Sequence, residues 1–207
     1  NEVGADGAYY YAPTLASAIY AGGDVCWDTY PTGTGDVNFC DIPASCAPAS
    51  LTEITLGILL KPKVLAGYNA LIDRDDEGVR KWQWRRKASS SAVEFSPIDA
   101  AAGGLSVEVI ESPGGALVVD TPVLLHMRMR NTGRMEMAQN GLNVLTFDGA
   151  VARLYGHDTS GLRIARRRQG DSAFNAYIAE TMVWTRFLTD GEIFQQAAAA
   201  GMRTEYT

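Results

Sequence analysis

Near the carboxyl end of the chain, residues 173–193 read AFNAYIAETMVWTRFLTDGEI. The segment predicts one long strand that leads directly into a helix. Thr189 and Glu192 have the spacing of a capping box, in which the hydroxyl and the carboxylate each satisfy a backbone donor in the first turn. The helix is expected over 190–200, and Gly201 follows at the point where a left-handed residue ends many helices.

Strands are predicted upstream by apolar residues at every second position, which is typical of a sheet with one buried face. Residues 54–60 and 123–130 show this alternation most clearly. In the second range the opposite face carries His126, Arg128 and Arg130, and that face is expected to be wet or to contact a ligand.

A tight hairpin is predicted at Asn140-Gly141, because Asn-Gly favours the type I′ turn between paired strands. Further strands are expected at 69–74, 79–86, 92–95, 117–119, 151–155 and 162–166. Together these segments are enough for two antiparallel sheets.

The C-terminal pattern resembles the signature of laminin-G-like domains, which belong to the concanavalin A-like jelly-roll superfamily. The matching residues are Ile178, Glu180, Arg186, Leu188, Thr189, Glu192 and Ile193. Upstream of these residues, three more ranges, 125–129, 138–141 and 162–165, match the family's motifs in order and spacing. The resemblance implies an all-β, two-sheet antiparallel jelly-roll sandwich with one short C-terminal helix. It also implies a domain that binds glycans or glycoproteins in an extracellular, cell-surface or virion setting.

Length and composition predict one globular domain over residues 1–207. The chain has 207 residues, of which 46% are hydrophobic and 20% charged, as in ordinary packed domains. Residues 21–50 differ, since they are rich in Gly, Pro, Asp and Thr and show little periodicity. We expect a long irregular loop or insertion there, serving as a functional loop or as an arm that contacts a partner.

The net charge of −6 argues against nucleic acid as a partner, because phosphates require a concentrated basic face. Residues 80–87 and 166–168 carry most of the clustered positive charge, which could contact an acidic polysaccharide or a partner protein, or could simply be solvated. No apolar run reaches the length of about 18 residues that crosses a bilayer, so no membrane insertion is expected.

Candidate ligand-binding residues are Trp82, Trp84, Arg86 and His157. The two tryptophans and Arg86 lie two residues apart, so they share one strand face, where aromatic rings either stack on sugars or pack in the core. His157 lies in a glycine-flanked loop and is either a ligand contact or an ordinary loop residue.

Asp73, Asp75 and Asp76 form the densest acidic cluster, which either holds calcium or lies in a metal-free turn between strands. The same carboxylates are the best candidates for hydrolysis of a glycosidic bond, which needs a pair of acidic groups. The Glu-x-Asp-x-x-Glu strand motif of jelly-roll glucanases does not occur in the chain, so we assign no catalytic residue.

Cys26, Cys40 and Cys46 have no zinc-site spacing and no histidine nearby. Either two of them form a disulfide and leave one thiol, or all three are reduced.

The sequence therefore predicts a non-catalytic module that binds carbohydrate or glycoconjugates, with calcium as an optional ion. A structural component of a virion that packs against copies of itself or other virion proteins is the first alternative. A glycoside hydrolase is the second.

Overall fold

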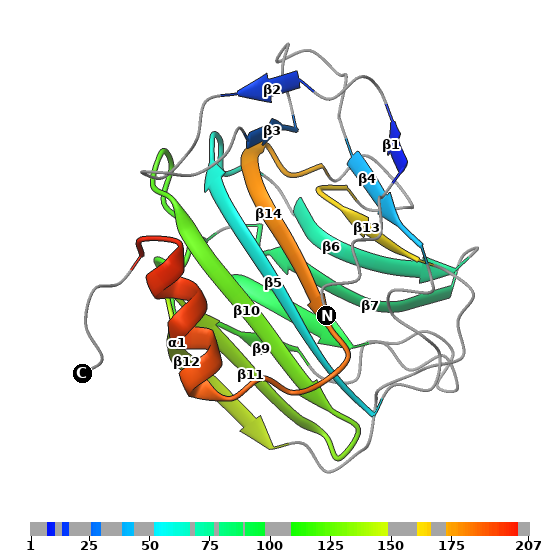
Figure 1. Cartoon of the computed structure of the whole chain (residues 1–207). Coiled ribbons are helices and arrows are strands. Elements are labelled where there is room, and N and C mark those ends of the chain that lie inside the picture. Colours follow the sequence, from blue (N-terminus) through cyan, green and yellow to red (C-terminus); the bar gives the residue numbers. More distant parts are fainter. Residues whose placement is uncertain are drawn as a thin grey trace.

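The computed structural model describes most of the chain, and its described part forms a two-sheet antiparallel jelly-roll sandwich with one short C-terminal helix (Figure 1). The described residues are 8–10, 14–16, 26–29, 39–43, 52–66, 69–76, 79–88, 90–97, 109–148, 161–166 and 173–202. No helix among them is long and apolar enough to cross a membrane.

In the described part of the chain each sheet has seven strands, and neighbouring strands are antiparallel. Sheet A has the order β1 (Ala8–Tyr10), β4 (Phe39–Ile42), β13 (Leu162–Ile164), β6 (Asn69–Asp76), β7 (Val79–Arg86), β8 (Val93–Pro97) and β9 (Ile110–Glu111). Sheet B has the order β12 (Leu142–Asp148), β11 (Arg134–Gln139), β10 (Val123–Arg130), β5 (Glu53–Pro62), β14 (Ala176–Trp184), β3 (Cys26–Asp28) and β2 (Thr14–Ala16).

The core lies between the two sheets and is built from in-register rows of apolar side chains. In sheet A the row runs through Cys40, Ile164, Ile72, Trp84, Phe95 and Ile110, one residue from each of six neighbouring strands. On the facing side, alternate residues of β5 and β10 in sheet B, such as Leu56 and Met127, belong to the same apolar cluster. The predicted alternation at 54–60 and 123–130 is confirmed.

The helix α1 (Asp190–Ala199) covers part of the outer face of sheet B, next to β10, β11 and β12 (Figure 1). Its start is the predicted capping box, with the Thr189 hydroxyl accepting from the Glu192 amide at 3.2 Å and the Glu192 carboxylate accepting from the Thr189 amide at 2.8 Å. Its buried residues Ile193 and Ala197 pack against small apolar clusters on that face.

The expectation of a wet or ligand-facing surface opposite the core face of β10 is wrong for His126 and Arg128. Both side chains are buried, because α1 and the segment before it cover them. A strand that alternates perfectly can still be buried on both faces when a helix packs on its polar side, and period two alone does not reveal that helix.

The His126 ring lies between α1 and the backbone of β5. Its Nε2–H donates to the Gln196 side-chain oxygen at 2.7 Å, and its ring centroid lies 6.1 Å from that of Trp184. Gly57 lies opposite His126 on β5, and a Cβ there would be only 3.2 Å from both rings and 3.0 Å from Met182. Any larger residue at position 57 would therefore require the two rings and the Met182 side chain to shift by a few tenths of an ångström.

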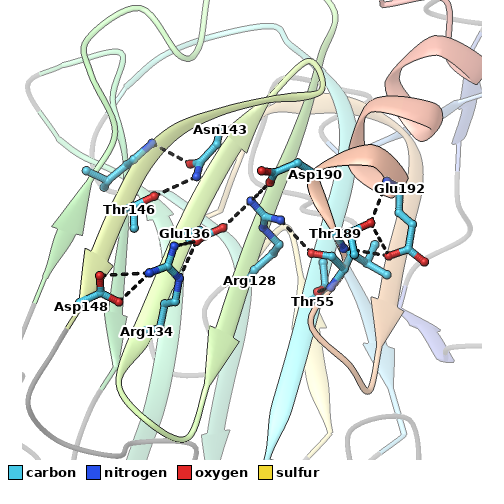
Figure 2. Close-up of polar contacts among 12 residues, drawn as sticks. Thr55, Arg128, Arg134, Glu136, Asn143, Thr146, Asp148, Thr189, Asp190 and Glu192 are labelled. Carbon is cyan, nitrogen blue, oxygen red and sulfur yellow. Dashed lines mark hydrogen bonds and ion pairs between the residues drawn. The ribbon is translucent and has the colours of Figure 1, made fainter. Parts of the chain in front are cut away.

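Arg128 is the centre of a polar network on this outer face (Figure 2). Its guanidinium is 2% exposed, donates to the Leu188 carbonyl at 2.8 Å and pairs with Asp190 at 2.6 Å and with Glu136. Glu136 in turn accepts from Arg134 Nε at 2.7 Å. The network therefore joins β10 and β11 to the segment that leads into α1.

The first residues of β5 also hold the segment between β14 and α1. The Thr55 hydroxyl donates to the Arg186 carbonyl at 2.8 Å and accepts from the Leu188 amide at 3.0 Å. A Glu53 carboxylate oxygen accepts from the Phe187 amide at 3.1 Å. These bonds satisfy backbone groups between β14 and α1 that belong to neither element.

Two sequence-based expectations need correction. Residues 21–50 are not irregular throughout, because β3 and β4 bury Trp27 in the core and place Cys40 in the core row. These strands have only three and four residues, too few for a visible alternation. Residues 117–119 form no strand, and their Val118 and Val119 are exposed. The strand predicted at 151–155 lies outside the described residues.

Replacing Arg128 with methionine is expected to lower the free energy of unfolding by about 3 kcal/mol, because it removes one partner of a buried ion pair. Arg130→Met is the matched control. The guanidinium groups of Arg128 and Arg130 both lie over the Phe187 ring, at 5.0 and 4.1 Å from its centroid, but the Arg130 side chain is 42% exposed. The control should cost at most about 1 kcal/mol. Urea unfolding of both variants measures the difference, and equal losses would contradict the role given to the network.

The buried His126 should make stability depend on pH. The pKa of His126 is lowered from 6.5 to about 4, mainly by burial; the Gln196 hydrogen bond partly opposes this, and the nearby Arg128 makes a smaller lowering contribution. Between these two values the unfolded chain binds the proton and the folded chain does not, so stability falls as the pH drops from 6.5 to 4.

The loss attributable to His126 over that interval is expected to approach about 3 kcal/mol. Urea unfolding of the wild type and of His126→Gln across the interval measures it, because the variant lacks the titrating group. If both proteins lose stability equally as the pH falls, His126 is not responsible.

Candidate functional site

The outer face of sheet A carries a row of polar side chains set in register across four strands. The row consists of Asp41 on β4, Arg163 on β13, Asp73 on β6 and Gln83 on β7, and we call it the polar row. Each of these residues is next in sequence to a residue of the core row, so each points away from the core. The register that packs the core therefore also assembles the polar row.

One half of this face is a buried hydrogen-bonded group that holds an arginine. Asp73 is 0% exposed and accepts from the Gln83 amide at 3.2 Å. The Gln83 side-chain oxygen accepts from Arg85 Nη1 at 3.0 Å, and Arg85 also pairs with Glu94 on β8. Two partners thus fix the Arg85 guanidinium, whose side chain is still 22% exposed.

The other half centres on a bidentate ion pair. Arg163 Nε and Nη2 each donate to one carboxylate oxygen of Asp41, both at 2.8 Å. The same guanidinium lies 4.1 Å from the ring centroid of Phe39, and that of Arg166 lies 5.5 Å from it. Ring and carboxylate together orient Arg163, which is partly exposed.

Arg85 and Arg163 are therefore cations held in fixed positions on a rigid sheet. A guanidinium keeps its charge and presents several donors in one plane, which suits oxygen-rich ligands. Sites on strands hold such donors more precisely than sites on loops. The carboxylates of this face, Asp41, Asp73 and Glu94, already accept hydrogen bonds from neighbouring side chains. In chemical terms the arrangement can donate hydrogen bonds to hydroxyl, carboxylate or sulfate oxygens.

Of the aromatic and cationic residues selected from the sequence, the two whose side chains are described are both buried. Trp84 is fully buried in the core row, where its ring cannot reach a ligand. Arg86, the last residue of β7, is also buried. Trp82 lies in β7 opposite Arg74, and its side chain is not among the described ones. His157 lies outside the described residues.

The acidic cluster lies within a strand and not in a turn. Asp73, Asp75 and Asp76 all belong to β6, and of their side chains only that of Asp73 is described, on the outer face. No group of three or more acidic, histidine or cysteine side chains suited to a metal ion occurs in the described part of the chain.

The structure describes two of the three cysteines, Cys26 and Cys40. Cys26 lies in sheet B and Cys40 in sheet A, and no disulfide joins these two. Burial, with a smaller contribution from the Asp41 carboxylate, raises the pKa of the Cys40 thiol to about 11. That thiol stays protonated at neutral pH and packs as a small apolar group. Cys46 lies outside the described residues.

Of the residues on the polar face, the sequence singled out only Asp73, as a calcium candidate, and Arg85 only as part of the basic range 80–87. Gln83 and Arg85 could have been found, because they alternate with Trp84 along a predicted strand. Arg163 likewise alternates with Leu162 and Ile164. Their long-range partners could not be found, since Asp41 lies in the segment assigned to a loop and pairs with Arg163 over 122 positions of chain.

Comparisons with known proteins identify the fold. No protein-family model matches the chain, and no curated protein matches it. Among solved structures, the binding domain of botulinum neurotoxin serotype G is similar with a TM-score of 0.70 and 9% identity, over 96% of this chain and 47% of that one. The chain thus spans about half the length of that domain.

Two smaller domains match over nearly their whole length. Domain 4 of AbnA, an extracellular arabinanase of Geobacillus stearothermophilus solved with arabinotriose, gives a TM-score of 0.68 at 11% identity, over 92% of this chain and 87% of that one. The CBM40 of a Ruminococcus gnavus IT-sialidase, bound to α2,3-sialyllactose, gives a TM-score of 0.62 at 12% identity, over 93% of this chain and 96% of that one. The protein accordingly has a two-sheet jelly-roll β-sandwich fold, and at these identities the similarity shows the fold alone.

The Asp41–Arg163 pair should stabilise the polar face measurably. In a double-mutant cycle of Asp41→Asn and Arg163→Gln, we expect a coupling energy of at least about 1 kcal/mol, because the pair is bidentate and partly buried. The exposed pair Lys87–Glu111 of the same sheet, 2.6 Å apart, is the control and should couple by less than about 0.5 kcal/mol. Denaturant unfolding gives both values, and a larger coupling in the control would contradict this ranking.

Proposed function

We propose that residues 1–207 form a single laminin-G-like module that binds carbohydrate or glycoconjugates without catalysing their cleavage. Its setting would be extracellular, on a cell surface or on a virion. The observation that carries the proposal is the polar face of sheet A, where Arg85 and Arg163 are held as oriented donors on a rigid strand surface. The fold supports it, because two structural neighbours are described in complex with arabinotriose and α2,3-sialyllactose.

Sugars are rich in hydroxyl groups that both donate and accept hydrogen bonds. On the polar face the partly exposed Arg85 and Arg163 can donate and the partly exposed Asp41 carboxylate can accept, whereas Asp73, Gln83 and Glu94 are buried and hold the arginines in place. Because the sheet fixes these groups in advance, little side-chain entropy would be lost when a sugar binds. The polar face thus has the preorganisation that a binding site requires.

The state of the described carboxylates favours binding over hydrolysis. A glycosidase needs two carboxyl groups free to reach the two sides of one glycosidic bond. On the polar face, Asp41 is engaged by Arg163, Asp73 by Gln83 and Glu94 by Arg85. Each of these contacts would have to break before the carboxylate could act as an acid, base or nucleophile.

A glycan array followed by calorimetry with the strongest ligand tests this function. Arg163→Lys keeps the charge but loses the bidentate geometry, and it should weaken binding at least about fivefold if the oriented guanidinium contacts the sugar. Lys87→Gln, which removes a cation paired with Glu111, should leave the affinity unchanged.

Absence of binding to every glycan on the array would overturn the proposal. Release of reducing sugars from a polysaccharide would instead indicate a hydrolase. A defined oligomer in light scattering, together with no glycan binding, would favour an assembly component.

A further inference from the structure

A second group of charged and aromatic side chains lies on the outer face of sheet B, beside the C-terminal end of α1. Asp28 on β3, Tyr177 on β14 and Lys61 on β5 are direct register partners across three neighbouring strands. Lys63 follows at the end of β5. We call these four residues the Tyr177 cluster.

The two lysines of this cluster converge on one aromatic ring. The Lys61 ammonium lies 5.1 Å and the Lys63 ammonium 5.0 Å from the centroid of the Tyr177 ring. Aromatic rings attract cations through their quadrupole, so the ring helps to hold both ammonium groups in place. All three side chains are partly exposed and therefore accessible to a ligand.

The charges in the cluster do not balance. The carboxylate of Asp28 accepts from Lys63 through both oxygens, at 2.9 and 3.1 Å. Among the residues that the structure describes, no carboxylate forms an ion pair with Lys61. The cluster therefore holds two cations and one anion, on a chain whose net charge is −6. The partly exposed Lys61 ammonium, which pairs with none of the described carboxylates, favours an anionic ligand.

The surroundings suit a sugar that bears the anion. Tyr177 packs in one apolar cluster with the partly buried Ala200 and Met202 at the end of α1. Such a surface can contact the C–H groups of a pyranose ring. The Tyr177 hydroxyl and the Asp28 carboxylate supply a donor and further acceptors for its hydroxyl groups.

We propose that the Tyr177 cluster binds the carboxylate or sulfate group of an acidic glycan, with Lys61 as the principal contact. The anion lies against the two ammonium groups and replaces the missing counter-charge of Lys61. This inference rests on the proposed function, since it takes the ligand to be a glycan, and it adds the chemical class of that glycan and a second contact surface on the sheet opposite the polar face.

Calorimetric titration with three probes tests the inference. The probes are 3′-sialyllactose, which carries a carboxylate, lactose 3′-sulfate, which carries a sulfate, and neutral lactose. We expect at least one acidic probe to bind about tenfold more tightly than lactose, and its affinity to fall as the ionic strength rises. The probe that gains more identifies which anion the site prefers.

Lys61→Gln is the decisive variant, because it removes a charge without breaking an ion pair and should leave the fold intact. It should abolish the preference for the acidic probe and leave lactose binding unchanged. Lys63→Gln should weaken acidic binding too, with an added loss of stability because the ion pair between Lys63 and Asp28 is lost. Lys87→Gln on sheet A is the matched control and should change nothing.

Acidic binding that survives Lys61→Gln would overturn the inference, because the anion would then lie elsewhere. Equal binding of neutral and acidic probes would also overturn it and leave the proposed function standing. If no glycan binds, on the array or in titration, both fail together.

Discussion

The register of sheet A is the constraint on which the rest of the molecule depends. The row from Cys40 through Ile164, Ile72 and Trp84 to Phe95 must face sheet B, because it supplies half of the core. Side chains alternate along a strand, so a slip of one residue would turn this row away from sheet B and place the charged residues beside it in the core. Core packing thereby places every residue of the polar face, including the Arg163–Asp41 pair, without any separate constraint.

Sheet B uses its outer face differently, since α1 turns half of that face into a second, smaller interior. Arg128 and His126 lie there because a helix covers them, and each is compensated by a partner from α1 or its approach: Asp190 and the Leu188 carbonyl for one, Gln196 for the other. The part of the face beyond the helix keeps the Tyr177 cluster accessible. The same helix therefore closes one polar region of the sheet and borders another.

The elements with strong local signals were predicted well from the sequence. The strands 54–60, 79–86 and 123–130, the Asn140-Gly141 turn and the capped helix all appear where expected, since alternation, a type I′ turn and a capping box act over a few neighbouring residues. The short strands β3 and β4 were not predicted, because three or four residues carry too little pattern and are held only by their neighbours in the sheets.

Alternation of apolar residues and the capping box were enough to determine a two-sheet sandwich that ends in a short helix. They were not enough to say which polar faces stay open. For Trp84 the sequence left both a ligand contact and the core open, and the ring lies in the core; His126 was placed on a face expected to be open, and it lies beneath α1. Only the tertiary structure decided this. The partners Asp41–Arg163 and Gln196–His126 are 122 and 70 residues apart, and contacts over such distances exist only after the sheets and the helix have packed together.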